Sequence, residues 1–206
     1  MTGGPGDFHE RLTGQPWDDS YRDTRPPWDA GRPHAAVVRL AEEGAFAGRV
    51  LDAGCGTGEN AIEVAARGLE VLGVDVAPTA IEVARSKAAA RGVNLDFLVG
   101  DALQLGRLGR EFQTILDCGL FHTFDDQERQ RYVDSLATVT ARGGLVHLLC
   151  FNDTTPGNGG PRHVSQAELR SAFRDGWRVV RIDADRYETK FDKQGAPAWL
   201  ARIERR

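Results

Sequence analysis

The fold is decided by one stretch of the chain, Leu51-Asp52-Ala53-Gly54-Cys55-Gly56-Thr57-Gly58-Glu59-Asn60. Arg49-Val50-Leu51, which lead into it, are typical of the end of a short apolar strand, and residues 61–66 are typical of a helix. The stretch therefore predicts a strand, a glycine turn and a helix N-terminus. Glycine permits positive φ and lets a ligand approach the backbone, and the free N–H groups of a helix N-terminus attract negative groups. This geometry predicts a nucleotide-like cofactor at the carboxyl end of a strand.

The spacing of the glycines narrows the kind of cofactor. Gly54, Gly56 and Gly58 form G-x-G-x-G, whereas the dinucleotide-binding motif is G-x-G-x-x-G. No Lys followed by Ser or Thr comes after the glycines, which excludes a P-loop. With Asp52 in front, residues 50–58 resemble the first motif of class I S-adenosylmethionine-dependent methyltransferases. A glycine trio alone is also compatible with a flexible turn, but the aspartate and the later motifs favour a cofactor site.

A second acidic residue follows the next predicted strand. Residues 70–75 are typical of a short strand that ends at Asp75, 17 positions beyond Gly58. An acid at this place accepts hydrogen bonds from ribose hydroxyls in nucleotide-binding α/β units. Its alternative role is to cap the following helix, but that helix has a start of its own at Pro78. The run Asp75-Val76-Ala77-Pro78 also resembles the second methyltransferase motif.

A third predicted strand, residues 95–100, precedes Asp101 and Ala102. The resemblance implies that Asp101 binds the amino group of adenine and that Ala102 lies at the edge of the ring. A carboxylate is a suitable acceptor for an exocyclic amino group. Taken alone, Asp101 is equally compatible with an ordinary turn aspartate.

The fourth predicted strand, residues 112–118, leads into Gly119-Leu120-Phe121-His122-Thr123-Phe124. Ligands of open α/β sheets bind at this edge. His122 can take a proton from a hydroxyl, thiol or ring nitrogen during methyl transfer, because its pKa is ordinarily near neutral. It can equally be a packing residue that stabilises the cofactor loop. Phe121 and Phe124 either contact an aromatic substrate or fill the core, and the core is the better interpretation for Phe124.

The N-terminal part has a different composition. Residues 1–16 predict a flexible tail. Residues 17–33 interleave aromatic residues with arginines and prolines, which argues against a regular core element. We expect this segment to be a lid, because aromatic faces attract a sulfonium-type cation and an arginine can pair with the carboxylate of the cofactor. Alternatively the aromatic residues, Trp17 in particular, cover an exposed flank of the sheet.

Composition limits the class of partner. A length of 206 residues favours one domain, and a net charge of −4 provides no basic field for nucleic acid. The chain has no long apolar run and no features of a signal peptide, which argues against membrane insertion and secretion. Its three cysteines lie far apart and match neither a disulfide framework nor a zinc site. We therefore expect a cytoplasmic protein without nucleic-acid or membrane partners and without a metal; the oligomeric state is left open.

The order of elements predicts an α/β layer fold, because strands and helices alternate through five strands before a helix and two strands joined by a short turn. Those two closing strands must be antiparallel. The resemblance implies a single-domain, Rossmann-like, seven-stranded sheet with the last strand antiparallel and helices on both faces, the methyltransferase domain spanning residues 34–206.

Within the family, the sequence is similar to thiopurine-methyltransferase-like enzymes, and among these to the mycobacterial heterocyclic toxin (benzoquinone-type) methyltransferases. Pro-Pro-Trp-Asp at 26–29, Asp-Cys-Gly-Leu-Phe-His at 117–122 and a Gly/Pro-rich loop before residue 163 carry this likeness. His34 stands where this group would have Gln.

The resemblance implies an enzyme that transfers a methyl group from S-adenosylmethionine to O, S or N of a small aromatic or heterocyclic molecule and releases S-adenosylhomocysteine. Orientation and exclusion of water would then be the main tasks of the protein. One alternative is a protein of the same fold without transfer activity or with a non-methylating reaction. Another is an NAD-dependent oxidoreductase, which the glycine spacing and the lack of a Tyr-x-x-x-Lys pair oppose. The residues expected to bind the cofactor are Trp28, Asp52, Gly54, Cys55, Gly56, Gly58, Asp75, Val76, Asp101, Ala102 and Cys118; those expected to contact the substrate are Tyr21, Phe121 and Phe151; and the expected catalytic residue is His122.

Overall fold

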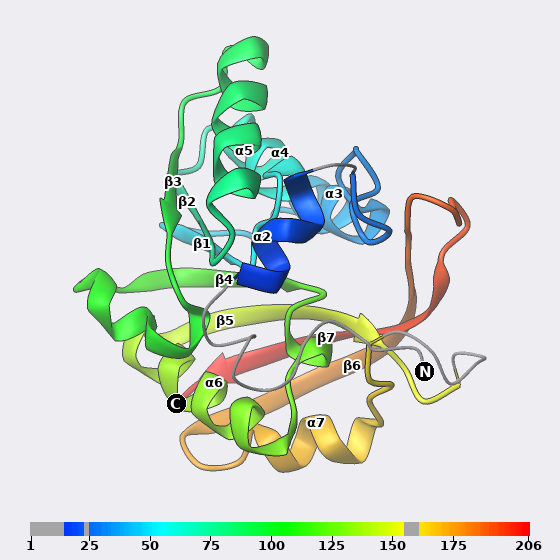
Figure 1. Ribbon diagram of the computed structural model, residues 1–206. Helices are drawn as coiled ribbons and strands as arrows, with labels where there is room; N and C mark the ends of the chain where they lie inside the picture. The colour runs from blue at the N-terminus through cyan, green and yellow to red at the C-terminus, as the bar shows by residue number, and fades with distance from the viewer. Residues whose placement is uncertain (1–14, 23–24, 155–160) are drawn as a thin grey trace.

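The computed structural model describes residues 15–22, 25–154 and 161–206, and its frame is a seven-stranded sheet (Figure 1). The strand order across the sheet is β3-β2-β1-β4-β5-β7-β6. The strands are β1 (Val50–Ala53), β2 (Val71–Asp75), β3 (Asp96–Val99), β4 (Phe112–Cys118), β5 (Thr140–Phe151), β6 (Trp177–Tyr187) and β7 (Ala196–Arg205). The predicted seven-stranded sheet is thereby confirmed.

The directions of the strands indicate which edge of the sheet binds a ligand. Strands β1 to β5 pair in parallel with their neighbours, and β7 is antiparallel to both β5 and β6. Only β7 is therefore reversed, as predicted. The chain order reverses between β1 and β4, which lie side by side. Ligands of open α/β sheets bind beyond the carboxyl ends of the strands at such a switch point.

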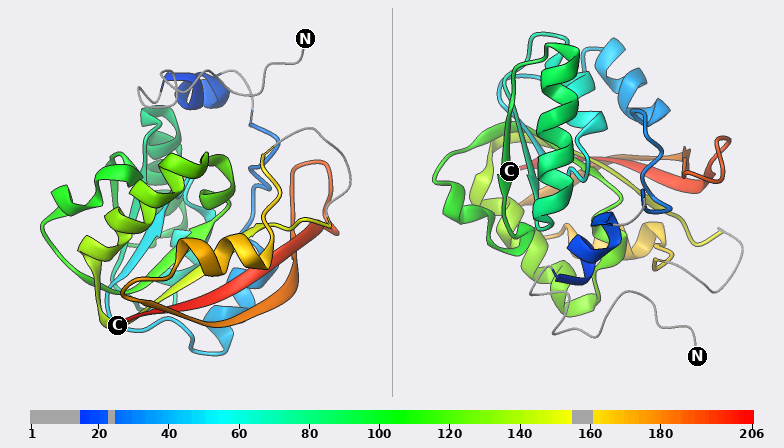
Figure 2. Two further views of the ribbon diagram at one scale, coloured as in Figure 1. Left: turned by 90° about the horizontal axis from the view of Figure 1, so that it is seen from below. Right: turned by 45° about the horizontal axis from the view of Figure 1, so that its top comes forward.

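Helices cover both faces of the sheet (Figures 1 and 2). On one face, α3 (Ala35–Glu42), α4 (Glu59–Ala65) and α5 (Pro78–Arg91) share an apolar cluster with the strands. On the other, the 3-10 helix η1 (Ala102–Leu108), α6 (Asp126–Val139) and α7 (Gln166–Ala172) share a second cluster. The prediction of helices on both faces is confirmed.

The two clusters follow from the alternation of side chains along the strands. Val50 and Leu116 pack into the cluster of α3, α4 and α5, whereas their chain neighbours Leu51 and Ile115 pack into the cluster of α6 and α7. Successive residues of a strand point to opposite faces. All four side chains are buried, so the central strands are apolar on both faces, as parallel sheets require.

The boundary between α6 and β5 differs from the prediction. The sequence predicts that this helix ends near Arg142-Gly143-Gly144, but α6 ends at Val139 and β5 begins at once with Thr140. The Thr140 hydroxyl donates to Leu136 O at 2.7 Å, and Thr140 pairs with Phe112 of β4. This side-chain bond closes the helix without a glycine. The sequence also predicts capping boxes formed by Asp125 with Glu128 and by Ser165 with Glu168, and both are present at the starts of α6 and α7.

The segment before residue 34 also differs from the prediction. Residues Gln15–Arg22 form a helix, α2, although the composition of this segment argues against a regular element, and the predicted tail over residues 1–16 overlaps the helix at Gln15 and Pro16. The buried Asp18 accepts a hydrogen bond at 2.7 Å from the backbone N of Thr79, which lies in the first turn of α5. Asp18 also pairs with Arg22 at 2.9 Å. A carboxylate at a helix N-terminus satisfies a backbone N–H that has no partner within the helix. Helix α2 is therefore fixed to α5.

Two predicted segments lie wholly or partly outside the described residues: the tail over residues 1–14 and the Gly/Pro-rich loop over residues 155–160. Among the helices of the described ranges, none combines the length and the apolar character needed to cross a membrane.

Candidate active site

The glycine turn lies where β1 ends. Gly54 and Gly56 have φ of 74° and 51°, a region that glycine enters at little cost. Val74 O of β2 accepts from Gly54 N at 2.8 Å and from Cys55 N at 3.0 Å, which fixes the turn to the neighbouring strand. A Cβ built on Gly56 would lie 3.1 Å from Tyr21 Oη. The turn and α2 therefore enclose a space that any side chain at Gly56 would narrow.

A cavity of about 580 Å³ opens beside this turn. It extends along the strand ends, from Val74 and Asp75 of β2 past Gly54 to Cys118 of β4. A smaller cavity of about 60 Å³ lies against residues 54–57 and 59–60 of the turn and the start of α4. The two cavities share Tyr21, Trp28, Gly54, Cys118 and Tyr187. The larger volume falls within the range of about 300–1,000 Å³ that is typical of small-molecule sites.

Asp75 and Asp101 both line the large cavity, as does the residue after each of them, Val76 and Ala102. The Asp75 carboxylate accepts from Gly56 N at 2.8 Å and from Ala77 N at 2.9 Å. Asp101 accepts from two groups of its own turn, at 2.8 Å each. A carboxylate has about four acceptor positions, so both side chains retain capacity for a hydroxyl or an amino group in the cavity.

Polar contacts behind the turn join three segments. Thr57 Oγ1 donates to Asp29 Oδ2 at 2.8 Å and accepts from Lys87 Nζ at 2.7 Å. Lys87 also pairs with one carboxylate oxygen of Glu59, and Arg91 pairs with the other, at 2.8 Å each. Because Lys87 and Arg91 belong to α5, these contacts hold the glycine turn, α5 and the N-terminal segment in one arrangement.

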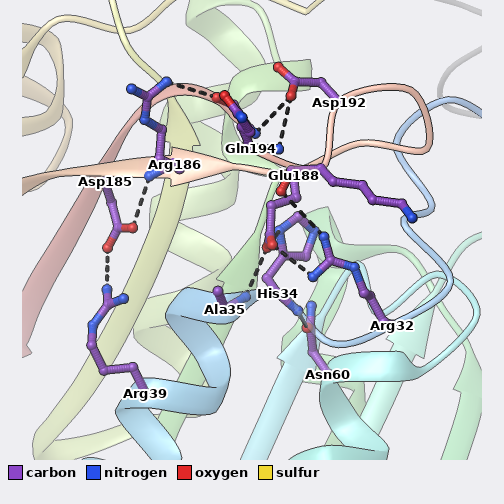
Figure 3. A network of polar contacts seen from close by, with 12 residues as sticks. Arg32, His34, Ala35, Arg39, Asn60, Asp185, Arg186, Glu188, Asp192 and Gln194 are labelled. Atoms are coloured by element: carbon purple, nitrogen blue, oxygen red, sulfur yellow. Dashed lines mark hydrogen bonds and ion pairs between the residues drawn. The ribbon is translucent and has the colours of Figure 1, made fainter.

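Glu188 connects the end of β6 to the chain before α3 (Figure 3). One of its oxygens pairs with Arg32 Nη1 at 2.9 Å and the other accepts from Ala35 N at 2.8 Å. Asn60 of α4 accepts from His34 N at 2.9 Å. Burial lowers the pKa of His34 to about 4, so this imidazole is neutral at pH 7. Arg32, His34 and Asn60 all line the small cavity, and Glu188 fixes that wall.

Aromatic residues of the N-terminal segment face the large cavity. Trp28 Nε1 donates to Tyr21 Oη at 2.9 Å, and the Trp17 and Trp28 rings meet edge to face with centroids 5.7 Å apart. All three line the cavity. Lys190 N, beyond β6, donates to Pro27 O at 2.8 Å. The segment is thus held at the cavity from α5, from the glycine turn and from the chain after β6.

His122 also lines the large cavity. It lies in the 3-10 turn η2 (Phe121–Thr123) that follows β4. Its Nδ1 accepts a hydrogen bond from Phe151 N at 3.0 Å, and its ring stacks on the Phe151 ring at 4.7 Å and 6°. Tyr187 approaches the ring at 5.4 Å. Burial, and after it the charge of Arg129, lowers the pKa of His122 to about 3. The imidazole is therefore neutral at physiological pH.

Two of the residues predicted to bind the cofactor do not line either cavity. Asp52 is 1% exposed, and burial together with Asp117 raises the pKa of Asp52 to about 8. Gly58 is a packing position, because a Cβ there would lie 2.8 Å from both Ala84 Cβ and Phe97 Cζ. Asp52 and Gly58 therefore support the turn from beneath and do not face the cavity space.

Two of the residues predicted to contact the substrate also lie elsewhere. Phe121 is fully buried in the core, 5.9 Å from the Phe173 ring, with the Arg129 guanidinium 4.8 Å above it. Phe151 lines neither cavity, and its half-buried ring stacks on the His122 ring at 4.7 Å. Phe124, for which the sequence favours the core, packs against that core, 5.0 Å from the Tyr132 ring, and also lines the large cavity. The structure thus corrects the substrate assignment of Phe121 alone, because the short turn η2 directs this side chain into the core.

Several lining residues were not singled out from the sequence. Tyr187 is the clearest, since it lines both cavities and its ring contacts His34, His122 and Phe151. No motif marks it, because its partners come from three distant segments. Attention to every residue just beyond a strand end would have found Gly100 and Gly119. The other unpredicted residues of the large cavity are Pro27, Val74, Leu103, Leu120, Thr123, Asp125, Glu128, Pro161 and Arg162.

Comparisons with known proteins agree with this geometry. A family model described as a methyltransferase domain matches residues 50–144. A curated relative from Mycobacteroides abscessus, 2-heptyl-1-hydroxyquinolin-4(1H)-one methyltransferase, is 38% identical over 159 residues, which are 76% of this chain and 70% of the relative. The chain belongs to the class I S-adenosylmethionine-dependent methyltransferases. Membership confirms the predicted family and enzyme class and sets aside the NAD-dependent alternative.

Solved structures agree with the assignment of this chain to the methyltransferase family. A structure concerned with conversion of a disulfide bond into a thioacetal group during echinomycin biosynthesis is 36% identical, with a TM-score of 0.84 over 94% of this chain and 92% of the other. The N-methyltransferase NodS from Bradyrhizobium japonicum, in complex with S-adenosyl-L-homocysteine, has a TM-score of 0.74 at 18% identity over 94% and 98% of the two chains. The second likeness shows the fold alone.

The residues of the methyltransferase fit its cofactor, S-adenosylmethionine. The glycine turn forms a hollow that a Cβ at Gly56 would narrow, and two carboxylates with free acceptor capacity stand at neighbouring strand ends. Within residues 15–22, 25–154 and 161–206, no group of three or more His, Cys, Asp or Glu side chains is arranged to hold a metal ion. Its three cysteines are free thiols.

Proposed function

We propose that this methyltransferase transfers a methyl group to the hydroxyl oxygen of a small aromatic heterocycle of the hydroxyquinolone class. The observation that carries the proposal is the large cavity, which continues from Asp75 and Asp101 to His122 and Phe124 on the other side of the sheet switch point. A cavity of about 580 Å³ has room for more than an adenosyl group. The 38%-identical relative named for a hydroxyquinolone supports this choice of acceptor.

In this proposal the cofactor lies along the strand ends. Asp75 binds the ribose hydroxyls and Asp101 the adenine amino group, with the backbone of the glycine turn beneath. When bound, the cofactor supplies a methyl group on a positively charged sulfur. The rings of Tyr21 and Trp28 suit a cation, because the face of an aromatic ring is electronegative. The further residues that we assign to the cofactor side are Gly54, Cys55, Gly56, Val76, Ala102 and Cys118.

The task of the chain is then to align the acceptor and to keep water out. We propose that residues 17–33 act as the lid, because Trp17, Tyr21 and Trp28 line the cavity. Asp29 binds the glycine turn, and Arg32 pairs with Glu188 just after β6. Alignment of two reactants can contribute as much as about 7–11 kcal/mol to lowering a barrier. No acid–base cluster is required for this contribution.

The experiment is a methyl-transfer assay with a graded panel of acceptors. The purified protein is incubated with S-adenosylmethionine and 2-heptyl-1-hydroxyquinolin-4(1H)-one, its analogue without the 1-hydroxyl, and simple phenols. We expect that, of these acceptors, only the hydroxyquinolone gives an O-methyl product and S-adenosylhomocysteine, both detected by mass spectrometry. Asp75→Asn should weaken cofactor binding, whereas Asp96→Asn on the exposed start of β3 should not. Tight cofactor binding without methylation of any member would overturn the proposal.

One observation favours a second acceptor, sulfur. The 36%-identical structure is concerned with conversion of a disulfide bond into a thioacetal group. The panel therefore includes an aromatic thiol and a cyclic disulfide. Methylation of sulfur in these compounds, with no product from the hydroxyquinolone, would identify sulfur as the acceptor atom in place of oxygen.

We also propose that the protein works in the cytoplasm and has no nucleic-acid partner. Its net charge of −4 and its three free thiols support this, because unpaired cysteines are usual in a reducing compartment. Fractionation of cells that express the full chain, with nuclease treatment as a control, tests both statements.

A further inference from the structure

The contacts of His122 determine which ring nitrogen carries its proton. Phe151 N–H donates to Nδ1 at 3.0 Å, so Nδ1 is the acceptor. A neutral imidazole has one protonated and one bare nitrogen. With Nδ1 bare, the proton lies on Nε2. Both protonation of the ring and transfer of the proton to Nδ1 would bring two N–H groups face to face.

The fold explains why this backbone N–H is available. The last pair between β4 and β5 joins Cys118 to Leu149, and β5 continues alone on that side to Phe151. The imidazole that follows β4 takes the place of the missing strand. It is held there by the Phe151 ring stacked at 4.7 Å, by Tyr187 at 5.4 Å and by the bond from Arg162 N to His122 O at 3.1 Å. The ring therefore has one orientation.

The other ring nitrogen is open to the large cavity. Among the described residues, Nε2 has no hydrogen-bond partner, yet it is not one of the fully enclosed polar atoms. The ring lines the cavity. The groups that act on the ring electrostatically are Arg129 of α6, His163 after β5 and His34 before α3, and Tyr187 of β6 packs against it at 5.4 Å. None of these is an acid that would draw a second proton onto the ring.

We propose that His122 is a hydrogen-bond donor to the acceptor oxygen, and that the enzyme takes hydroxyl compounds that have already lost their proton. This inference rests on the proposed function and names its substrate class: acidic, ring-conjugated hydroxyls that are oxyanions at neutral pH. Nε2 with its proton has no lone pair for a base. An oxyanion in an apolar cavity, in contrast, needs a donor, because an unpaired buried charge is costly.

The transfer step balances without a protein base. The substrate hydroxyl releases its proton to bulk water before binding. A lone pair of the oxyanion then forms the bond to the methyl carbon, while the carbon–sulfur bond breaks and its electron pair remains on sulfur. The negative and positive charges cancel in the step. His122 thus acts mainly in binding and orientation, since the charge that it stabilises is greatest before the reaction.

The first test examines the ring itself and needs no substrate. In histidine-labelled protein, long-range ¹H–¹⁵N correlation spectra distinguish a proton on Nε2 from one on Nδ1, and the His122 signals are assigned by their loss in His122→Gln. We expect a neutral ring protonated at Nε2 from pH 5.5 to 8.5. A ring protonated at Nδ1, or one that titrates near pH 6.5, would overturn the inference even if the hydroxyquinolone is methylated.

The second test separates a donor from a base kinetically. His122→Gln retains an amide donor but provides no base, and His122→Leu provides neither. We expect Gln to keep most activity and Leu to raise KM roughly 10- to 100-fold with a smaller change in kcat. Across hydroxyquinolones of different acidity, the midpoint of the kcat/KM–pH profile should follow the pKa of each free substrate. A midpoint that stays fixed across the series and vanishes in His122→Gln would establish a base. If the Leu variant does not fold, the Gln variant and the spectra decide.

The two proposals fail in different ways. If no hydroxyquinolone is methylated, the proposed function is wrong, while the protonation state of His122 is still read from the spectra. If methylation occurs but the spectra show Nδ1–H, the proposed function stands and the donor role is wrong.

Discussion

A substitution at Gly119 tests how firmly the wall of the cavity is packed. Gly119 follows β4 with φ of 91°, and a Cβ there would lie 2.3 Å from Tyr187 Oη and 2.8 Å from two ring carbons. Gly68 is the matched control, because its φ is 86° and nothing lies within 4 Å of the built Cβ. Both Ala variants carry a left-handed backbone cost of about 1–2 kcal/mol. Gly119→Ala must also displace a buried ring, which adds roughly 1–3 kcal/mol.

Urea unfolding followed by far-UV circular dichroism measures both variants. We expect the free energy of unfolding to fall by about 1–2 kcal/mol for Gly68→Ala and by about 2–5 kcal/mol for Gly119→Ala. Adding Tyr187→Phe to Gly119→Ala removes the nearest atom, Oη, and should return part of the loss. Equal destabilisation of the two glycine variants would refute the reasoning, since it would mean that the Tyr187 ring moves aside freely.

Three further predictions concern the turn and its supports. Gly56→Ala and its control Gly109→Ala (φ 61°, open space) should lose similar stability, about 1–2 kcal/mol, but only Gly56→Ala should weaken S-adenosylhomocysteine binding, by tenfold or more in calorimetry; equal affinities would contradict this. The pKa of Asp52 is about 8 when folded, above its value when unfolded, so this carboxyl takes up a proton on folding and its contribution to stability falls as pH rises from about 4 to 8. Asp52→Asn lacks this titration, so its unfolding free energy minus that of the wild type should rise by at least about 1 kcal/mol from pH 5 to pH 8. A difference that does not change with pH would argue against the raised pKa. Glu188→Ala removes the acceptor of Arg32 Nη1 and Ala35 N. It should lower the free energy of unfolding in urea by about 1–3 kcal/mol and weaken cofactor binding. Unchanged stability and unchanged binding would show that Glu188 is not needed to hold the wall of the small cavity.

Much of the fold could be predicted because local patterns and topology rules agree. The stretch around Gly54 and Gly56 predicts a strand, a turn and a helix. The strands β2 to β5 each end at, or just before, a polar residue or a glycine. The capping boxes at Asp125 and Ser165 mark two helix starts without any tertiary information. The end of α6 could not be read in this way, because the Thr140 side chain closes the helix and the glycines lie within β5.

The candidate site was predictable only in the part that a motif describes. Asp75 and Asp101 were found because Asp75 ends one strand and Asp101 closely follows another, and both line the cavity. Phe121 was misplaced, because in a three-residue 3-10 turn one residue decides between core and cavity, and no periodicity covers so short an element. Tyr187 was missed because the contacts that place it join residues separated by more than a hundred positions of sequence in some cases. Such contacts exist only once the sheet is assembled.

The bond between Asp18 and the Thr79 amide has a practical consequence. That amide belongs to the first turn of α5, where helical N–H groups lack a partner within their own helix. Its rate of exchange with deuterated solvent is therefore governed by whether the helix carrying Trp17 and Tyr21 is seated. For the lid function that we propose for residues 17–33, exchange at this one backbone N–H therefore measures how often helix α2 detaches from α5.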